Sequence, residues 1–304
     1  MAKALRVIFF GTSAFGVPIL RALADEHDVV LAVTQPDKPS GRGLSMSPSP
    51  VKDAACEIGL AVETPVKLDG DFVRRVIALQ ADALVCASYG KILPAALVTN
   101  PAMPALNVHP SALPKYRGAT PIQAALLAGD ATTAVTIMWM AARMDAGDIA
   151  LQAATDIEPD ENYGALHDRL SEIGARALLA ALDLLHRGEL VRMPQDESQA
   201  TYTRPISKPD LELRFTERSQ ELADRVRAFS PKPGAWISHE GRRLKILAAC
   251  SESRPPTGPP GTLSMTADGE PIVATVDGAL RLTTVIPEGK RQMSGREFAR
   301  GLRV

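Results

Sequence analysis

Residues 5–34 read LRVIFFGTSAFGVPILRALADEHDVVLAVT, and this stretch decides the fold class. The apolar run at residues 5–10 predicts a buried strand, which Gly11 ends. Helical spacing follows over residues 15–26, and residues 28–34 predict a second strand. A strand, a helix and a second strand in this order are typical of a doubly wound α/β fold with a mostly parallel sheet.

The turn between the first strand and the helix bears on the class of cofactor. A dinucleotide site needs the pattern G-x-G-x-x-G at this place. Residues 11–16 read GTSAFG, so Ser13 stands where the second glycine is required. We therefore expect a simple tight bend here and no nucleotide cofactor.

Further elements continue the α/β pattern up to about residue 189. The sequence predicts strands over residues 83–87, 105–108 and 133–140 and helices over residues 51–59, 71–80 and 162–186. Thr120, Pro121 and Gln123 have the composition of a helix start, with Thr120 as the N-cap. Residues 35–50 are rich in Pro, Gly and Ser and predict a long loop, a kind of segment that is often functional.

The character of the sequence changes after residue 189. Residues 190–209 are polar, contain three prolines and predict a linker. One helix, over residues 219–229, then precedes several short alternating segments separated by Gly-containing turns. Short strands at this spacing predict a small OB-like β-barrel. We therefore expect a first domain over residues 1–189, a linker over 190–209 and a second domain over 210–304.

Composition narrows the class of protein. The chain has 304 residues, enough for about two domains, and a net charge of −1. From residue 205 onward, 16 Lys and Arg stand against 12 Asp and Glu, which permits contact with nucleic acid. Three widely spaced cysteines favour a reducing compartment over a disulfide framework or a zinc site. No apolar stretch approaches the ~18 residues of a membrane span, so we expect a cytoplasmic protein.

The strand predicted over residues 105–108 leads into the most informative polar side chains. Asn107 and His109 are two residues apart and so point to the same side of a strand. They stand at its carboxyl end, where ligands bind in open α/β sheets. The residues alone leave open that His109 is a structural histidine satisfied by local hydrogen bonds.

A second loop supplies carboxylates. Asp145 and Asp148 follow the strand predicted over residues 133–140, and in a doubly wound sheet this loop can return to the edge where His109 lies. Taken alone, such a turn is usually solvated. Together, Asn, His and Asp suit acyl transfer: the amide donates to a developing oxyanion, the imidazole handles protons and the carboxylate orients the imidazole.

These motifs resemble the 10-formyltetrahydrofolate-dependent formyltransferases. The resemblance lies in residues 107–114 (NVHPSALP), 116–122 (YRGATPI) and 144–148 (MDAGD). Other motifs are similar to the branch of that family that formylates methionyl initiator tRNA: residues 34–37, 41–43, 48–52, 89–94, 195–197, 201–202, 207–208, 227–229 and 233–236. The resemblance covers nearly the whole chain.

The resemblance implies an activity and its residues. The formyl group of 10-formyltetrahydrofolate, a substrate, would pass to the α-amine of methionyl initiator tRNA, with Asn107, His109 and Asp145 as catalytic residues. The first domain would catalyse the reaction, and the second would help to hold the tRNA. Arg42 of the first domain and Lys208 of the linker would contact the tRNA. The folate would be bound by Ser111, Ala112, Leu113, Pro114, Tyr89, Gly90, Ile92 and Leu93. We expect no metal and a monomer.

Two positions depart from the family pattern. Ala112 stands where a leucine is usual, which loosens the expected folate-binding wall, and Leu44-Ser45 stand where some members carry lysines. Two alternatives remain: formylation of another amine, such as that of a sugar nucleotide, and a non-catalytic folate-binding or RNA-binding module. The C-terminal domain argues against the first, and the complete Asn107, His109 and Asp145 set argues against the second.

Overall fold

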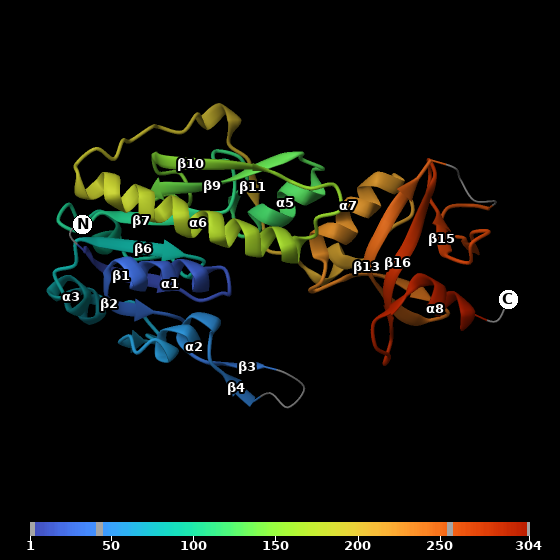
Figure 1. Ribbon diagram of the computed structural model, residues 1–304, viewed down its shortest axis with the longest axis horizontal. Helices are drawn as coiled ribbons and strands as arrows, with labels where there is room; N and C mark the ends of the chain where they lie inside the picture. Colours follow the sequence, from blue (N-terminus) through green and yellow to red (C-terminus); the bar gives the residue numbers. More distant parts are fainter. Residues whose placement is uncertain (1–3, 41–44, 254–257, 303–304) are drawn as a thin grey trace. The chain divides into compact units, whose positions relative to one another are not determined.

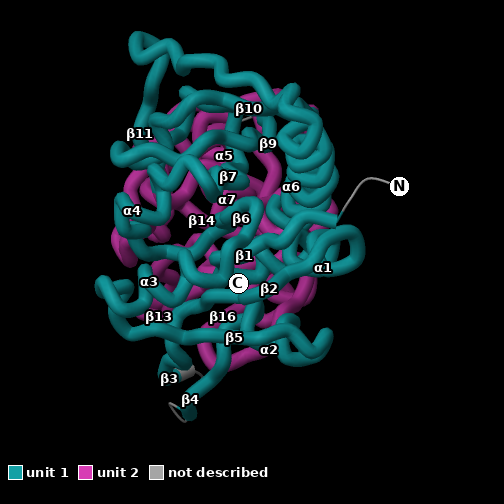
Figure 2. The backbone as a smooth tube through the Cα atoms, turned by 90° about the vertical axis from the view of Figure 1, so that its left-hand side faces the viewer, with its two compact units in different colours: residues 1–118, 133–155, 167–202 teal, residues 119–132, 156–166, 203–304 magenta. Residues whose placement is uncertain are grey.

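The computed structural model describes residues 4–40, 45–253 and 258–302 (Figure 1). The chain forms two compact units, which Figure 2 distinguishes by colour. The first contains residues 1–118, 133–155 and 167–202, and the second contains residues 119–132, 156–166 and 203–304. Because this grouping interleaves segments, it is not a division into domains along the chain. The bounds of 1–189, 190–209 and 210–304 therefore stay a prediction.

A seven-stranded sheet in the order β10-β9-β7-β6-β1-β2-β5 forms the centre of the first unit. Its strands are β1 (Arg6–Gly11), β2 (Asp28–Val33), β5 (Val62–Glu63), β6 (Ala83–Ala87), β7 (Ala105–His109), β9 (Thr132–Trp139) and β10 (Ile149–Asp156). From β7 through β6, β1 and β2 to β5, each strand is parallel to the next one in the sheet. The pair of β7 and β9 is antiparallel. The predicted mostly parallel sheet is confirmed.

Helices cover both faces of this sheet. In Figure 2, α1 (Gly16–Glu26) and α6 (Tyr163–His186) lie on one side of the strands, and α3 (Gly70–Ala78) and α4 (Ala95–Val98) lie on the other. The helix α2 (Pro50–Glu57) packs beside α1. Covered on both faces, the central strands are buried along almost their whole length, which explains their continuous apolar runs.

The strand order indicates where a ligand would bind. The chain proceeds from β1 outward to β2 and β5, and then returns to the other side of β1 to form β6 and β7. The order therefore reverses between β1 and β6. In open α/β sheets, ligands bind at such a reversal, beside the carboxyl ends of the strands. The loops that follow β6 and β7 contain all eight residues predicted to bind folate.

The second unit contains an antiparallel sheet of six strands and three helices among its described residues. The strands curl into a half-barrel, consistent with the predicted OB-like domain. The last helix begins at the predicted capping box, where the Ser294 and Glu297 side chains bond each other's backbone N–H. The elements are α5 (Pro121–Leu127), α7 (Ser219–Phe229), β12 (Ala235–His239), β13 (Arg242–Glu252), β14 (Leu263–Met265), β15 (Pro271–Ala274), β16 (Ala279–Pro287), β17 (Met293–Ser294) and α8 (Gly295–Arg300).

Three local predictions need correction. The segment 35–50, predicted as a loop, contains the two-stranded ribbon of β3 (Lys38–Ser40) and β4 (Ser45–Ser47), whose strands are too short and polar to show a pattern. The helix α5 starts at Pro121 as predicted, with Thr120 at the N-cap position, but the Thr120 hydroxyl makes no capping hydrogen bond and donates to the Arg204 carbonyl at 2.9 Å. The strand β10 was not expected, since its alanines and glutamine have low strand propensity.

The segment predicted as a linker contains ordered structure. It contains the 3₁₀ turns η1 (Glu197–Gln199) and η2 (Lys208–Leu211) and the strand β11 (Tyr202–Thr203), which pairs with β8 (Arg117–Gly118). Met193 also forms a bridge with Ile149 of β10. Much of this segment is therefore attached to the first unit.

Gly174 allows α6 to lie close to β7 and β9. A Cβ atom at this position would be 2.9 Å from Val108 Cγ1 and 3.4 Å from Val135 Cγ1. We expect Gly174→Val to lower the free energy of unfolding by about 1–3 kcal/mol, because it overpacks this contact. Urea unfolding measures the change. Gly70→Val is the matched control, since a Cβ there meets only Arg74 Nη1, at 3.5 Å. Equal losses in the two variants would contradict this account.

Candidate active site

The last residues of β7 place two polar side chains on one face of the sheet. Val108 lies toward Gly174 of α6, so the pleat directs Asn107 and His109 to the opposite face. Asn107 is half-buried and pairs in register with Cys86 of β6. His109 is 5% exposed. The strand therefore presents an amide and an imidazole side by side, as the sequence predicts.

Hydrogen bonding at His109 fixes the tautomer of the neutral ring. The ring atom Nε2 lies 3.1 Å from the carbonyl oxygen of Tyr116. A carbonyl only accepts, so Nε2 carries the proton and donates it. In the neutral ring, Nδ1 then holds a lone pair, and it faces Asp145 Oδ2 at 3.8 Å. The imidazole and the carboxylate therefore face each other directly.

Asp145 is held by the backbone around it. Its Oδ2 accepts a hydrogen bond from the Gly118 N–H at 2.8 Å. Its φ of 51° lies in the left-handed region, which is uncommon for residues other than glycine. Two residues later, a Cβ at Gly147 would lie 1.8 Å from the Trp139 carbonyl oxygen, so only glycine fits. The loop therefore has little freedom, and its carboxylate has a fixed direction.

Cys86, next to Asn107, can be excluded as a nucleophile. Burial raises the pKa of its thiol to about 12. Because the reactive form is the thiolate, the sulfur is inert near neutral pH. Asn107, His109 and Asp145 therefore remain the candidate catalytic residues of this edge.

The loop after β7 contains four of the predicted folate-binding residues. Ser111 is buried, and its hydroxyl donates to the Lys115 carbonyl at 2.7 Å. Thr136 of β9 donates to the Ser111 carbonyl at 2.6 Å and accepts from the Leu113 N–H at 3.3 Å. Ala112 and Pro114 are half-buried, whereas Leu113 is buried. The loop is thus attached to β9, and its surfaces at Ala112 and Pro114 remain accessible.

The loop after β6 contains the other four. Tyr89 is buried with its ring edge against Phe10, at 5.2 Å between centroids, and burial raises the pKa of its phenol to about 12. The Tyr89 side chain therefore belongs to the core. Gly90 has a φ of 78°, and a Cβ there would meet Gln35 Nε2 at 2.7 Å. Leu93 is buried, whereas Ile92 is 92% exposed and offers an apolar surface to a ligand.

Of the two residues predicted to contact tRNA, one lies in the described part of the chain. Arg42 lies outside the described residues. Lys208 is exposed and is the first residue of η2 in the second unit. That turn is stabilised by the Ser207 and Asp210 capping box, and Arg204 pairs with Asp210 at 2.6 Å. Lys208 thus extends from an ordered turn.

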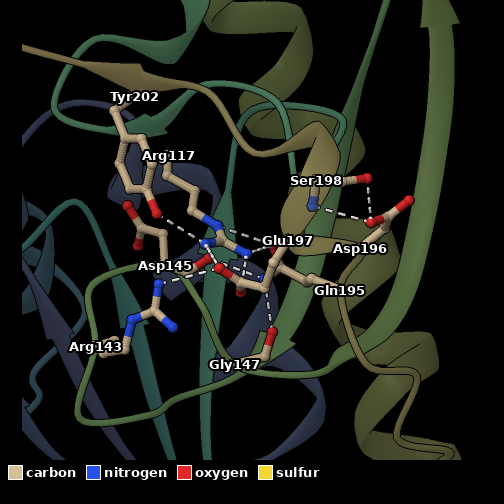
Figure 3. Close-up of polar contacts among 9 residues, drawn as sticks. All are labelled: Arg117, Arg143, Asp145, Gly147, Gln195, Asp196, Glu197, Ser198 and Tyr202. Atoms are coloured by element: carbon tan, nitrogen blue, oxygen red, sulfur yellow. Dashed lines mark hydrogen bonds and ion pairs between the residues drawn. The ribbon is translucent and has the colours of Figure 1, made fainter.

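A network around Arg117 was missed by sequence reasoning (Figure 3). Arg117 is 0% exposed, and its guanidinium contacts Gln195, Glu197 and Tyr202. The motifs at residues 116–118, 195–197 and 201–202 appeared in the sequence only as parts of a resemblance. Because Arg117 and Gln195 are 78 residues apart, spacing gave no means of pairing them.

The described part of the chain contains neither a cluster of metal-binding side chains nor a membrane-spanning helix. No group of three or more His, Cys, Asp and Glu side chains within residues 4–40, 45–253 and 258–302 could hold a metal ion. Among the same residues, no helix is long and apolar enough to cross a membrane.

Two family models match the chain. One, described as formyl transferase, matches residues 5–182, and one, described as formyl transferase, C-terminal domain, matches residues 205–303. A methionyl-tRNA formyltransferase of Heliobacterium modesticaldum is 40% identical over 309 residues, covering 99% of this chain and 98% of the relative. One of Chromohalobacter salexigens is 44% identical over 319 residues, covering 100% and 98%.

Solved structures share the fold at lower identity. The N-formyltransferase of Helicobacter canadensis, in complex with folinic acid and dTDP-3-aminofucose, aligns with a TM-score of 0.68 and 16% identity over 91% of this chain and 98% of its own. HypX of Aquifex aeolicus, in complex with tetrahydrofolic acid, aligns with a TM-score of 0.67 and 17% identity over 97% of this chain. The match spans 47% of the HypX chain.

The Arg117 network should make stability depend on pH. Hydrogen bonds from Arg117, and then from Arg143, hold the pKa of Glu197 below its usual range. A lowered folded-state pKa adds stability above the ordinary value of about 4.3, and this stability is lost as pH falls further. We expect Glu197→Gln to be less stable than the wild type at neutral pH.

The difference should begin to shrink below about pH 4, because the Glu197 carboxylate takes up a proton in the unfolded chain before it does so in the folded protein. Urea unfolding of both proteins at neutral and acidic pH measures it. Glu172→Gln, which changes an exposed carboxylate of α6, is the control. A Glu197→Gln difference that stays constant with pH would contradict the ion pair.

Proposed function

The chain belongs to the formyl transferase family, and we propose that it transfers the formyl group of 10-formyltetrahydrofolate to the α-amine of methionyl initiator tRNA. One observation carries this proposal. The chain is 40 to 44% identical to methionyl-tRNA formyltransferases over nearly its whole length, across both matched domains. The arrangement of Asn107, His109 and Asp145 at the carboxyl end of β7 supports it, because it suits acyl transfer.

The proposed reaction passes through a tetrahedral intermediate. The amine nitrogen attacks the formyl carbon, and the π electron pair of the carbonyl moves to its oxygen. Asn107 donates a hydrogen bond to this oxyanion, and the His109 Nε2–H is shared between the oxyanion and the Tyr116 carbonyl. When the carbonyl re-forms, the bond from carbon to N10 of the folate breaks. The amine loses one proton and N10 gains one, so the products are the formylated amine and tetrahydrofolate.

Asp145 has two roles in this proposal. Its carboxylate orients the His109 ring, because Oδ2 faces Nδ1 at 3.8 Å. It also assists removal of the proton from the attacking amine. The present distance exceeds that of a hydrogen bond, and such contacts commonly tighten when substrate binds.

The binding residues are assigned to the two substrates. Ser111, Ala112, Leu113 and Pro114 after β7, with Tyr89, Gly90, Ile92 and Leu93 after β6, hold the folate. The Tyr89 contribution comes from its backbone, because its ring is in the core. Arg42 and Lys208 contact the tRNA. The enzyme works as a monomer in the cytoplasm, and its three free cysteines fit a reducing compartment.

A substrate comparison tests the function. The protein is incubated with 10-formyltetrahydrofolate and either charged initiator tRNA, charged elongator tRNA or dTDP-3-aminofucose, and the formylated product is measured. We expect formylation of initiator methionyl-tRNA above both others. Formylation of the sugar nucleotide alone would make the protein a sugar-amine formyltransferase. No product with any amine would make it a binding module.

His109 is the most direct residue to change. We expect His109→Ala to lower kcat by ~10²–10⁴-fold, the usual range for a positioned acid–base group. Binding of 10-formyltetrahydrofolate should change much less. Single-turnover formylation and folate titration measure the two effects. His186→Ala, at the exposed end of α6, is the matched control. A His109→Ala rate within about tenfold of wild type would remove this histidine from the mechanism.

A further inference from the structure

The segment 195–202 is placed to control the geometry of the catalytic pair. It falls between the two matched regions, 5–182 and 205–303, and so belongs to neither family domain. It nevertheless lies within the first unit and contacts both loops that touch His109 and Asp145. Figure 3 shows three of its side chains, Gln195, Glu197 and Tyr202, gathered around Arg117.

Arg117 links the two catalytic residues through its own backbone neighbours. The residue before it, Tyr116, supplies the carbonyl that accepts from His109 Nε2. The residue after it, Gly118, supplies the N–H that donates to Asp145 Oδ2. Any movement of Arg117 therefore changes the contacts of both His109 and Asp145.

The side chain of Arg117 is fixed by burial and charge. A fully buried cation requires a compensating anion and hydrogen bonds. Nη2 donates to Glu197 Oε1 at 2.8 Å and Nη1 to Oε2 at 3.2 Å, a forked pairing that sets direction as well as charge. Nη1 also donates to the Tyr202 hydroxyl at 3.1 Å.

Gln195 joins Arg117 to the Asp145 loop. Its Oε1 accepts from Arg117 Nε at 3.0 Å and Nη2 at 2.8 Å. Its Nε2 donates to the carbonyls of Asp145, at 2.9 Å, and Gly147, at 2.6 Å. Because arginine only donates and carbonyls only accept, the amide orientation is fixed. The side-chain amide of Gln195 thus holds the backbone of the loop in which Asp145 has its left-handed conformation.

These contacts close a ring. It runs from His109 to the Tyr116 carbonyl, through Arg117 to Gln195, and back through Asp145 to His109. We propose that Gln195 is a positioning residue for formyl transfer, acting through Arg117 and the Asp145 peptide to set the distance from the Asp145 carboxylate to His109. This inference rests on the proposed function, since it assigns a role within that reaction.

The expected effect is on the chemical step. A misplacement of about 1 Å can cost on the order of 10²-fold in rate, so Gln195→Leu should lower kcat by ~10–10²-fold. KM values for tRNA and folate should stay close to wild type, because Gln195 touches neither in this proposal. Gln199→Leu is the matched control, since that amide donates to Asp196 Oδ2 on the segment's outer side and should leave kcat unchanged.

A double-mutant cycle provides the decisive readout. Gln195→Leu, Asp145→Asn and the double variant are compared with wild type in single-turnover formylation. If Gln195 acts by aiming the Asp145 carboxylate, its replacement should cost little once that carboxylate is gone, so the two effects should not add. Additive losses, or a fully active Gln195→Leu protein, would overturn the proposal.

Controls distinguish a positioning role of Gln195 from a folding defect and from failure of the proposed function. Circular dichroism and thermal unfolding are recorded for each variant. If Gln195→Leu does not fold, Gln195→Glu enters the same cycle, because it keeps the Arg117 contact but turns an oxygen toward the two carbonyls. Failure of both to fold would assign Gln195 to the fold and overturn the proposal. Wild-type protein that does not formylate methionyl-tRNA would instead contradict the proposed function.

Discussion

A buried cation constrains the geometry of the active edge. Arg117 has no exposed surface, so its charge must be met by partners from the chain itself. Those partners come from residues 195–202, which are thereby held against the loop that follows β7 in the same unit. The same contacts fix the backbone on either side of Arg117, where Tyr116 meets His109 and Gly118 meets Asp145. Charge compensation and catalytic geometry are therefore coupled.

The sheet supplies the other half of the geometry. The reversal of strand order between β1 and β6 leaves the loops after β6 and β7 at one edge. The pleat of β7 turns Asn107 and His109 to the same face, while Val108 packs under α6 beside Gly174. Rigid packing on one side of β7 thus gives the polar side chains on the other a defined position. The Asp145 loop approaches from β9, where Gly147 lies against Trp139.

The sequence could predict features that depend on local pattern. Continuous apolar runs indicated β1, β6 and β7, and the pair Asn107 and His109 followed from a period of two. Features that depend on distant partners were not predictable. Gln195 and Arg117 carry no periodic relation, and β10 lacks the branched residues that mark a strand. Thr120 was predicted to cap α5 from local composition, but its hydroxyl donates to the carbonyl of residue 204, a partner that is distant in the sequence.

In the proposed reaction, the charge of the Asp145 carboxylate beside His109 is required for fast formyl transfer. Single-turnover formylation by Asp145→Asn measures this requirement, because the substitution keeps the shape of the side chain and removes its charge. We expect a rate loss of about 10²-fold or more, in the range of a positioned acid–base group, with an unchanged circular dichroism spectrum. A folded Asp145→Asn protein that formylates methionyl-tRNA at the wild-type rate would contradict it.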